Sequence, residues 1–175
     1  MKWTRSSKWI GGVGALLSAL FLPGASAGKD KDHPYRRSDV DMPVSLAVGT
    51  VRTPEFPVIK MGYVIMIQAE KHLPFKQLVC MMGVTANPFE RADCTSNDPL
   101  LRADWTVWDE DRIVKSGSST THADDAYTKQ YIVKYLGNFL GEAGKKYVVE
   151  VRFTKDGTPL NVNNPHLIVT QHRNR

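Results

Sequence analysis

Residues 147–154, YVVEVRFT, carry the most regular pattern in the chain and decide its fold class. Apolar side chains stand at every second position from Tyr147 to Phe153, with Val148, Glu150 and Arg152 between them. Successive side chains of a β-strand point to opposite faces of a sheet, so this alternation predicts a strand with one buried face. Asp156-Gly157 follows as a hairpin turn signal, and we expect 166–170 to form the closing strand.

Similar short segments recur upstream. Residues 40–48 alternate in the same way and include Pro43, which lacks an N–H, so an edge strand is expected there. Residues 63–70, YVIMIQAE, are rich in β-branched side chains, which predicts a central strand covered on both faces. Residues 101–114 are typical of a hairpin that turns at 109–111.

The remaining segments complete the predicted architecture. Residues 74–82 can form a turn or two of helix ended by Gly83, residues 116–125 are expected to be a polar loop, and residues 127–136 a further strand. With about seven or eight short strands and no long amphipathic helix, we expect one antiparallel β-sandwich, immunoglobulin-like in architecture, over residues 40–175.

The first 27 residues have the order of a secretory signal peptide. A basic start is followed by the apolar run Trp9–Leu22, a Pro-Gly pair and a small-residue site that predicts cleavage between Ala27 and Gly28. The run is too short for a membrane span, and position 28 is not the Cys that a lipid anchor needs. We therefore expect a soluble periplasmic or secreted protein with a flexible charged leader at 28–39.

Charge argues against nucleic acid as a partner. Three of the 23 basic residues lie in the expected signal peptide, which leaves 20 against 18 acidic residues in the mature chain. A nearly balanced surface lacks the basic footprint that binds phosphate backbones.

The two cysteines of the chain, Cys80 and Cys94, both lie in the mature part. Two thiols of a small exported domain usually pair, so we expect a disulfide. A redox or nucleophilic cysteine is the alternative, but there is no C-x-x-C and no histidine close to either residue.

Two segments near the C-terminus resemble a known group of proteins. Residues 137–151, GNFLGEAGKKYVVEV, and 164–169, NPHLIV, are similar to exported bacterial β-sandwich proteins of the immunoglobulin-like type, whose functions are unassigned. The resemblance covers roughly residues 51–169. It implies a fold and an exported location, and it carries no activity with it.

Candidate functional residues are few, and the sequence predicts no catalytic residue and no cofactor. His122, Asp124 and Asp125 have the residue types of a metal site, although a solvated polar loop is the simpler explanation. Trp108 shares a strand face with Arg102 and Asp104, so it could stack on a sugar, or instead shield the end of the hairpin.

Three functions remain open from the sequence. The first is non-enzymatic binding of another envelope or secreted protein, in an adaptor or immunity role, through strand addition at an exposed sheet edge. The second is a carbohydrate-binding module built on Trp108. The third is a hydrolase with a loop-borne acidic site.

Overall fold

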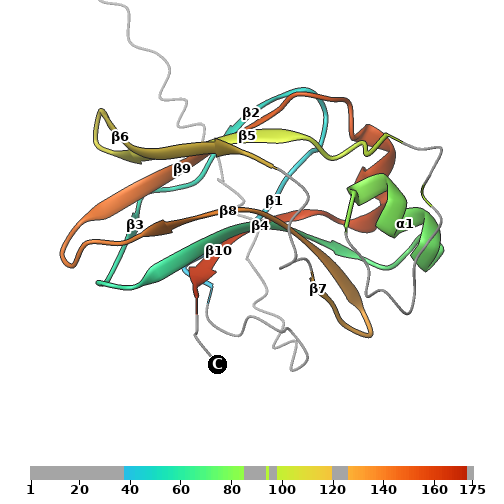
Figure 1. Ribbon diagram of the computed structural model, residues 1–175, viewed down its shortest axis with the longest axis horizontal. Helices are drawn as coiled ribbons and strands as arrows, with labels where there is room; N and C mark the ends of the chain where they lie inside the picture. Colours follow the sequence, from blue (N-terminus) through green and yellow to red (C-terminus); the bar gives the residue numbers. More distant parts are fainter. Residues whose placement is uncertain (1–37, 85–93, 95–97, 120–125, 173–175) are drawn as a thin grey trace, which may run out of the picture. The chain divides into compact units, whose positions relative to one another are not determined.

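The computed structural model describes residues 38–84, 94, 98–119 and 126–172, which form two antiparallel sheets packed face to face (Figure 1). One sheet has the strand order β1-β10-β4-β8-β7 and the other β2-β9-β5-β6, with β3 paired to β9. The strands are β1 (Val40–Pro43), β2 (Gly49–Arg52), β3 (Phe56–Pro57), β4 (Gly62–Glu70), β5 (Ala103–Asp109), β6 (Arg112–Ser118), β7 (Ala126–Tyr127), β8 (Tyr131–Leu140), β9 (Lys146–Phe153) and β10 (His166–Gln171).

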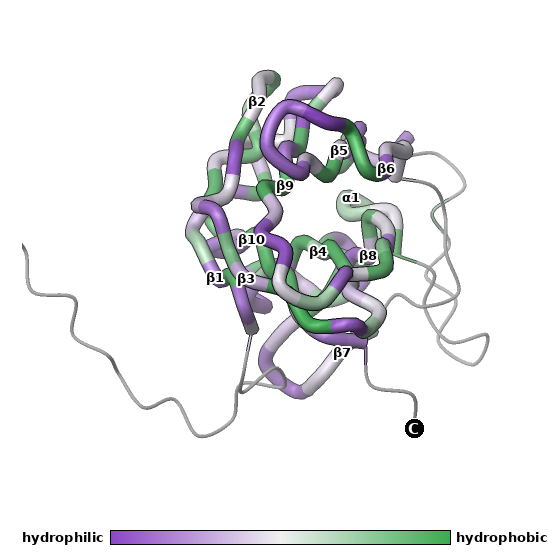
Figure 2. The backbone as a smooth tube through the Cα atoms, turned by 90° about the vertical axis from the view of Figure 1, so that its left-hand side faces the viewer, coloured by the Kyte–Doolittle hydropathy of each residue, from purple (hydrophilic) through white to green (hydrophobic). Residues whose placement is uncertain are grey.

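This architecture confirms the predicted all-β sandwich. β4 is a central strand between β10 and β8, with every side chain from Tyr63 to Ala69 buried, and β1 with its Pro43 is an edge strand. Hydrophobic segments run through β4 and β8 (green in Figure 2). The predicted cleavage site between Ala27 and Gly28 lies outside the described residues. No helix in the described part of the chain is long and apolar enough to cross a membrane.

Three expected element boundaries are wrong. The strand expected over 40–48 ends at Pro43 and β2 begins only at Gly49, because the backbone N–H of Leu46 binds the Asn161 side chain in place of a neighbouring strand. The segment 127–136 is not one strand, because the chain turns at 128–130 and separates β7 from β8. The Thr128 hydroxyl accepts hydrogen bonds from the backbone N–H groups of Gln130 and Tyr131, and this side-chain turn competes with a continuous strand. Residues 116–118, expected in a loop, belong to β6.

The hairpin expected at Asp156-Gly157 is also wrong. The Asp156 side chain accepts a hydrogen bond from the backbone N–H of Thr158, 2.9 Å away, and the 3-10 helix η2 (Thr158–Asn163) begins there. The chain then crosses to the other sheet, where β10 pairs with β4 and β1. An Asp-Gly pair serves a side-chain-capped turn as well as a hairpin, so the local signal does not distinguish the two.

One end of the sandwich carries the helix α1 (Phe75–Met82) (Figure 1). Gly83 ends it with a φ of 65°, a left-handed conformation that glycine adopts without steric cost. Cys80, on the buried side of α1, forms the expected disulfide with Cys94, with a Cα–Cα distance of 5.4 Å. The disulfide therefore ties the helix to the following segment of chain.

Trp105 of β5 packs between the two sheets, with its indole ring between two glycines. A Cβ atom on Gly137 of β8 would lie 2.2 Å from the indole ring, and one on Gly117 of β6 would lie 2.7 Å from it. In the pairing of β4 with β8, Ile65 faces Gly137 and Met66 faces Tyr135, so Leu136 is an extra residue in a β-bulge. The bulge brings both Leu136 and Gly137 to the inner face, and Gly137 leaves the space that the indole occupies.

This packing predicts a large cost for a single methyl group. Gly137→Ala should lower the free energy of unfolding by about 3 kcal/mol, because the ring has no room to move away from the new Cβ. Gly62→Ala in β4 is the matched control, since its Cβ would meet His172 at an ordinary 3.6 Å. Urea denaturation checks the difference, and equal midpoints for the two variants would show that Trp105 does not set the separation of the sheets.

Candidate functional site

A cavity of about 480 Å³ opens at the end of the sandwich next to α1. Apolar side chains of the α1 end and the start of β5 form part of its wall, and polar side chains complete it. Its lining consists of Met82, Gly83, Pro99, Leu101, Arg102, Ala103, Asp104, Ser118, Ser119, Lys134 and Thr154. Arg102 and Asp104, two of the predicted ligand-binding residues, therefore lie in its wall.

Lys134 is the unexpected member of this lining. It lies on the inner face of β8, in phase with Ile132 and Leu136, and only 3% of it is exposed. Its ammonium group donates a hydrogen bond to the carbonyl oxygen of Gly83, 2.7 Å away. A cation at the C-terminal end of a helix is favoured by the unpaired carbonyls there, so Lys134 helps to hold α1 against β8.

Arg102 and Asp104 both form ion pairs within the protein. Asp104 accepts hydrogen bonds from Arg152 at 2.6 Å and from Ser118 at 2.7 Å, and these bonds lower the pKa of its carboxyl below the usual value. Arg102 pairs with Asp98, whose other oxygen accepts a hydrogen bond from Lys155 at 3.0 Å. The polar rim of the cavity is thus largely neutralised by its own residues.

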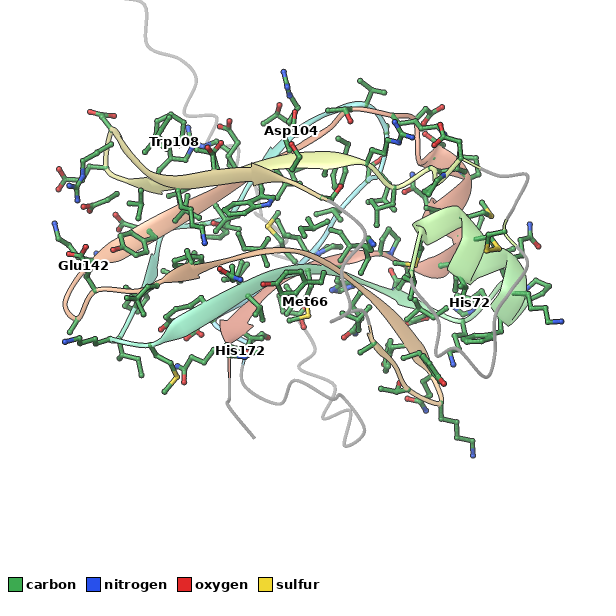
Figure 3. All side chains as sticks on the ribbon, in the orientation of Figure 1. Met66, His72, Asp104, Trp108, Glu142 and His172 are labelled. Atoms are coloured by element: carbon green, nitrogen blue, oxygen red, sulfur yellow. A yellow bond between two sulfur atoms is a disulfide. The ribbon has the colours of Figure 1, made fainter. Side chains whose placement is uncertain are left out.

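Trp108 does not join these residues in one site. It lies on the same outer face of β5 as Asp104, but four residues further along, which is about 13 Å on a strand (Figure 3). Its ring is half-buried, and the guanidinium carbon of Arg52 lies 5.9 Å from the ring centroid. Arg52 therefore occupies one of the faces that a sugar would stack on, and the geometry resembles a cation–π contact within the protein.

The predicted metal residues His122, Asp124 and Asp125 lie outside the described residues. Within the described ranges there is no group of three or more side chains that could together hold a metal ion.

The sheet edges are the other candidate binding features. β6 ends its sheet and is seven residues long without a proline, whereas the edge strands β1 and β2 have four residues each and β7 has two. The backbone N–H of Ser119 donates to the carbonyl of Ala103 at 2.6 Å. Because donors alternate along an antiparallel strand, the N–H groups of Ser116 and Ser118 point away from β5.

Comparison with known proteins shows a similarity in fold only. No protein family model matches the chain, and no curated protein matches it either. A protein from Sulfurospirillum deleyianum of known crystal structure is similar in fold, with a TM-score of 0.55 and 10% sequence identity. The similarity covers 77% of this chain and 98% of that one.

The surroundings of Trp108 predict a structural role. Trp108→Ala should lower the free energy of unfolding by about 2 kcal/mol, roughly half the cost of removing a fully buried Trp. Trp108→Phe, which keeps a ring beneath Arg52, should lose much less. Urea denaturation and retention on insoluble glycans measure the two properties together. If glycans retain the wild type, and Trp108→Ala abolishes this retention without loss of stability, the structural role is contradicted and a sugar site is favoured.

Proposed function

We propose that this protein is an exported, non-enzymatic β-sandwich that binds another envelope or secreted protein, as an adaptor or immunity protein, by accepting a strand at β6. The N-terminal pattern of residues 1–27 supports export, and the Cys80–Cys94 disulfide is typical of oxidising compartments. The sandwich provides a rigid frame for the edge.

The edge of β6 that faces away from β5 is the observation that carries the proposal, since no strand of the described residues pairs with it. An unpaired row of backbone N–H and C=O groups is a ready template for another strand, and natural proteins usually shorten or interrupt such edges. Here β1 is short and contains Pro43, whereas β6 has no proline and, beyond a bulge at Val114, pairs regularly with β5 from Lys115 to Ser118. Strand addition derives its affinity from main-chain hydrogen bonds and its specificity from the side chains along the edge.

The alternatives have less support. A carbohydrate-binding module would need an open Trp108 ring, and Arg52 lies over it. A hydrolase with an acidic site would depend on His122, Asp124 and Asp125, and that hypothesis stays a prediction from the sequence.

A proline on the outward side of the edge tests the proposal. Ser116→Pro should abolish partner binding, because it removes an N–H that points away from β5 and leaves the bonds to β5 intact. Ser116→Ala is the matched control and should bind normally. The measurement is a pull-down of the tagged mature protein from envelope extract of its own host, with partners identified and quantified by mass spectrometry.

Circular dichroism and thermal unfolding of both variants establish that they are folded. A stoichiometric partner that the wild type and Ser116→Ala retain and Ser116→Pro loses would support strand addition at β6. A partner that Ser116→Pro retains would contradict it, and so would the absence of any stoichiometric protein partner of the wild type.

A further inference from the structure

The open side of the sandwich lies between the edges of β6 and β8. β7 pairs only with Ile132 and Val133, so no described strand pairs with the rest of β8 on that side. Lys115 of β6 is opposite Val107, which is fully buried, so the Lys115 side chain starts toward the interior and not toward the outer face. The residue is nevertheless exposed, because it lies on the edge strand.

Lys115 spans this opening. Its ammonium group donates a hydrogen bond to the side-chain oxygen of Asn138 on β8, 2.8 Å away, and the Asn138 amide donates in turn to the Tyr135 hydroxyl at 2.6 Å. Asn138 is neutral, and Lys115 forms no ion pair with any carboxylate of the described residues. The opening therefore carries a positive charge without an acidic partner from the described fold.

A second donor lies beneath the same opening. The indole N–H of Trp105 is buried and has no hydrogen-bond acceptor among the described residues. A Cβ on Gly117 would be 3.2 Å from this nitrogen and one on Gly137 would be 2.6 Å from it, which places the N–H between β6 and β8. An unsatisfied buried donor is costly, so it indicates a place where an acceptor would be favourable.

An inward-pointing lysine on an edge strand also discourages unselective strand pairing. An apolar strand that joined β6 would bury the Lys115 ammonium without a counter-charge, which is unfavourable. A second copy of β6 would bring another lysine to the opening. A strand with a carboxylate at this position avoids both costs, because it neutralises Lys115 and supplies two acceptor oxygens.

We propose that the strand which adds to β6 is acidic, and that Lys115 selects it by binding one of its carboxylates at the opening between β6 and β8. This inference rests on the proposed function and adds the chemistry of the partner to it.

Two synthetic strand peptides test this selection directly. One alternates valine and glutamate over about nine residues, and its twin has lysine in place of glutamate, so that each peptide has registers in which its charged side chains share the face of Lys115. Calorimetry should find the glutamate peptide at least about tenfold tighter on the wild-type mature protein. Lys115→Glu should reverse this order, and Lys60→Glu, which changes an exposed loop lysine, should leave it as in the wild type.

Each outcome has a defined meaning. A tenfold preference that Lys115→Glu reverses supports selection by Lys115. Three results would overturn it. The two peptides could bind equally, Lys60→Glu could change the preference as much as Lys115→Glu does, or neither peptide could bind at about 1 mM. The Ser116 variants test the proposed function separately. If the two peptides bind equally and Ser116→Pro still loses the partner, only the inference that the partner strand is acidic is refuted.

Discussion

The fit of the Trp105 indole between Gly117 and Gly137 is the contact on which the arrangement of the two sheets depends. One glycine belongs to each sheet, and a Cβ at either position would come within 3 Å of the ring. The bulge at Leu136 turns Gly137 toward the ring, so a local irregularity of β8 and a residue of β5 determine each other. The same contact places the edges of β6 and β8 side by side.

The polar surface of the second sheet is largely occupied by its own ion pairs. Arg52 pairs with Glu150 across β2 and β9, and Arg152 pairs with Asp104 across β9 and β5. These exposed pairs add little stability, but they satisfy most of the charges that a ligand on this face would use. At the edge the opposite holds, since among the described residues nothing pairs with the outer side of β6 and no carboxylate pairs with Lys115. Binding capacity is therefore concentrated at the edge of the sheet and not on its face.

Much of the fold could be predicted because alternation reports directly which side of a strand is buried. It identified the β5–β6 hairpin, while the β-branched side chains of residues 63–70 identified β4 as central and Pro43 identified β1 as an edge. The break between β7 and β8 was missed because it depends on the Thr128 side chain, whose turn overrides a favourable strand pattern. The bulge at Leu136 was missed because its role is to make room for the indole of Trp105, a residue about thirty positions away in the chain.

The candidate site was harder to predict for a related reason. Arg102, Asp104 and Trp108 are even numbers of positions apart, so they share one face of the strand. This alternation predicts the face of each residue but not its neighbours on other strands. Asp104 is paired by Arg152 and Trp108 is covered by Arg52, and both arginines come from distant parts of the chain. The sequence did not indicate that the Lys134 side chain is buried, because a lysine in an alternating segment is ordinarily assigned to the solvent face.

Binding of a partner strand at β6 requires that this edge is unpaired in the free protein, and residue-resolved amide hydrogen exchange measures that directly. The amides of Lys115 and Gly117 should be protected by their bonds to β5, while those of Ser116 and Ser118 should exchange close to the rate of an unstructured peptide. Strong protection of Ser116 and Ser118 in the isolated protein would mean that the edge is already paired, and would contradict a role for β6 in binding a partner.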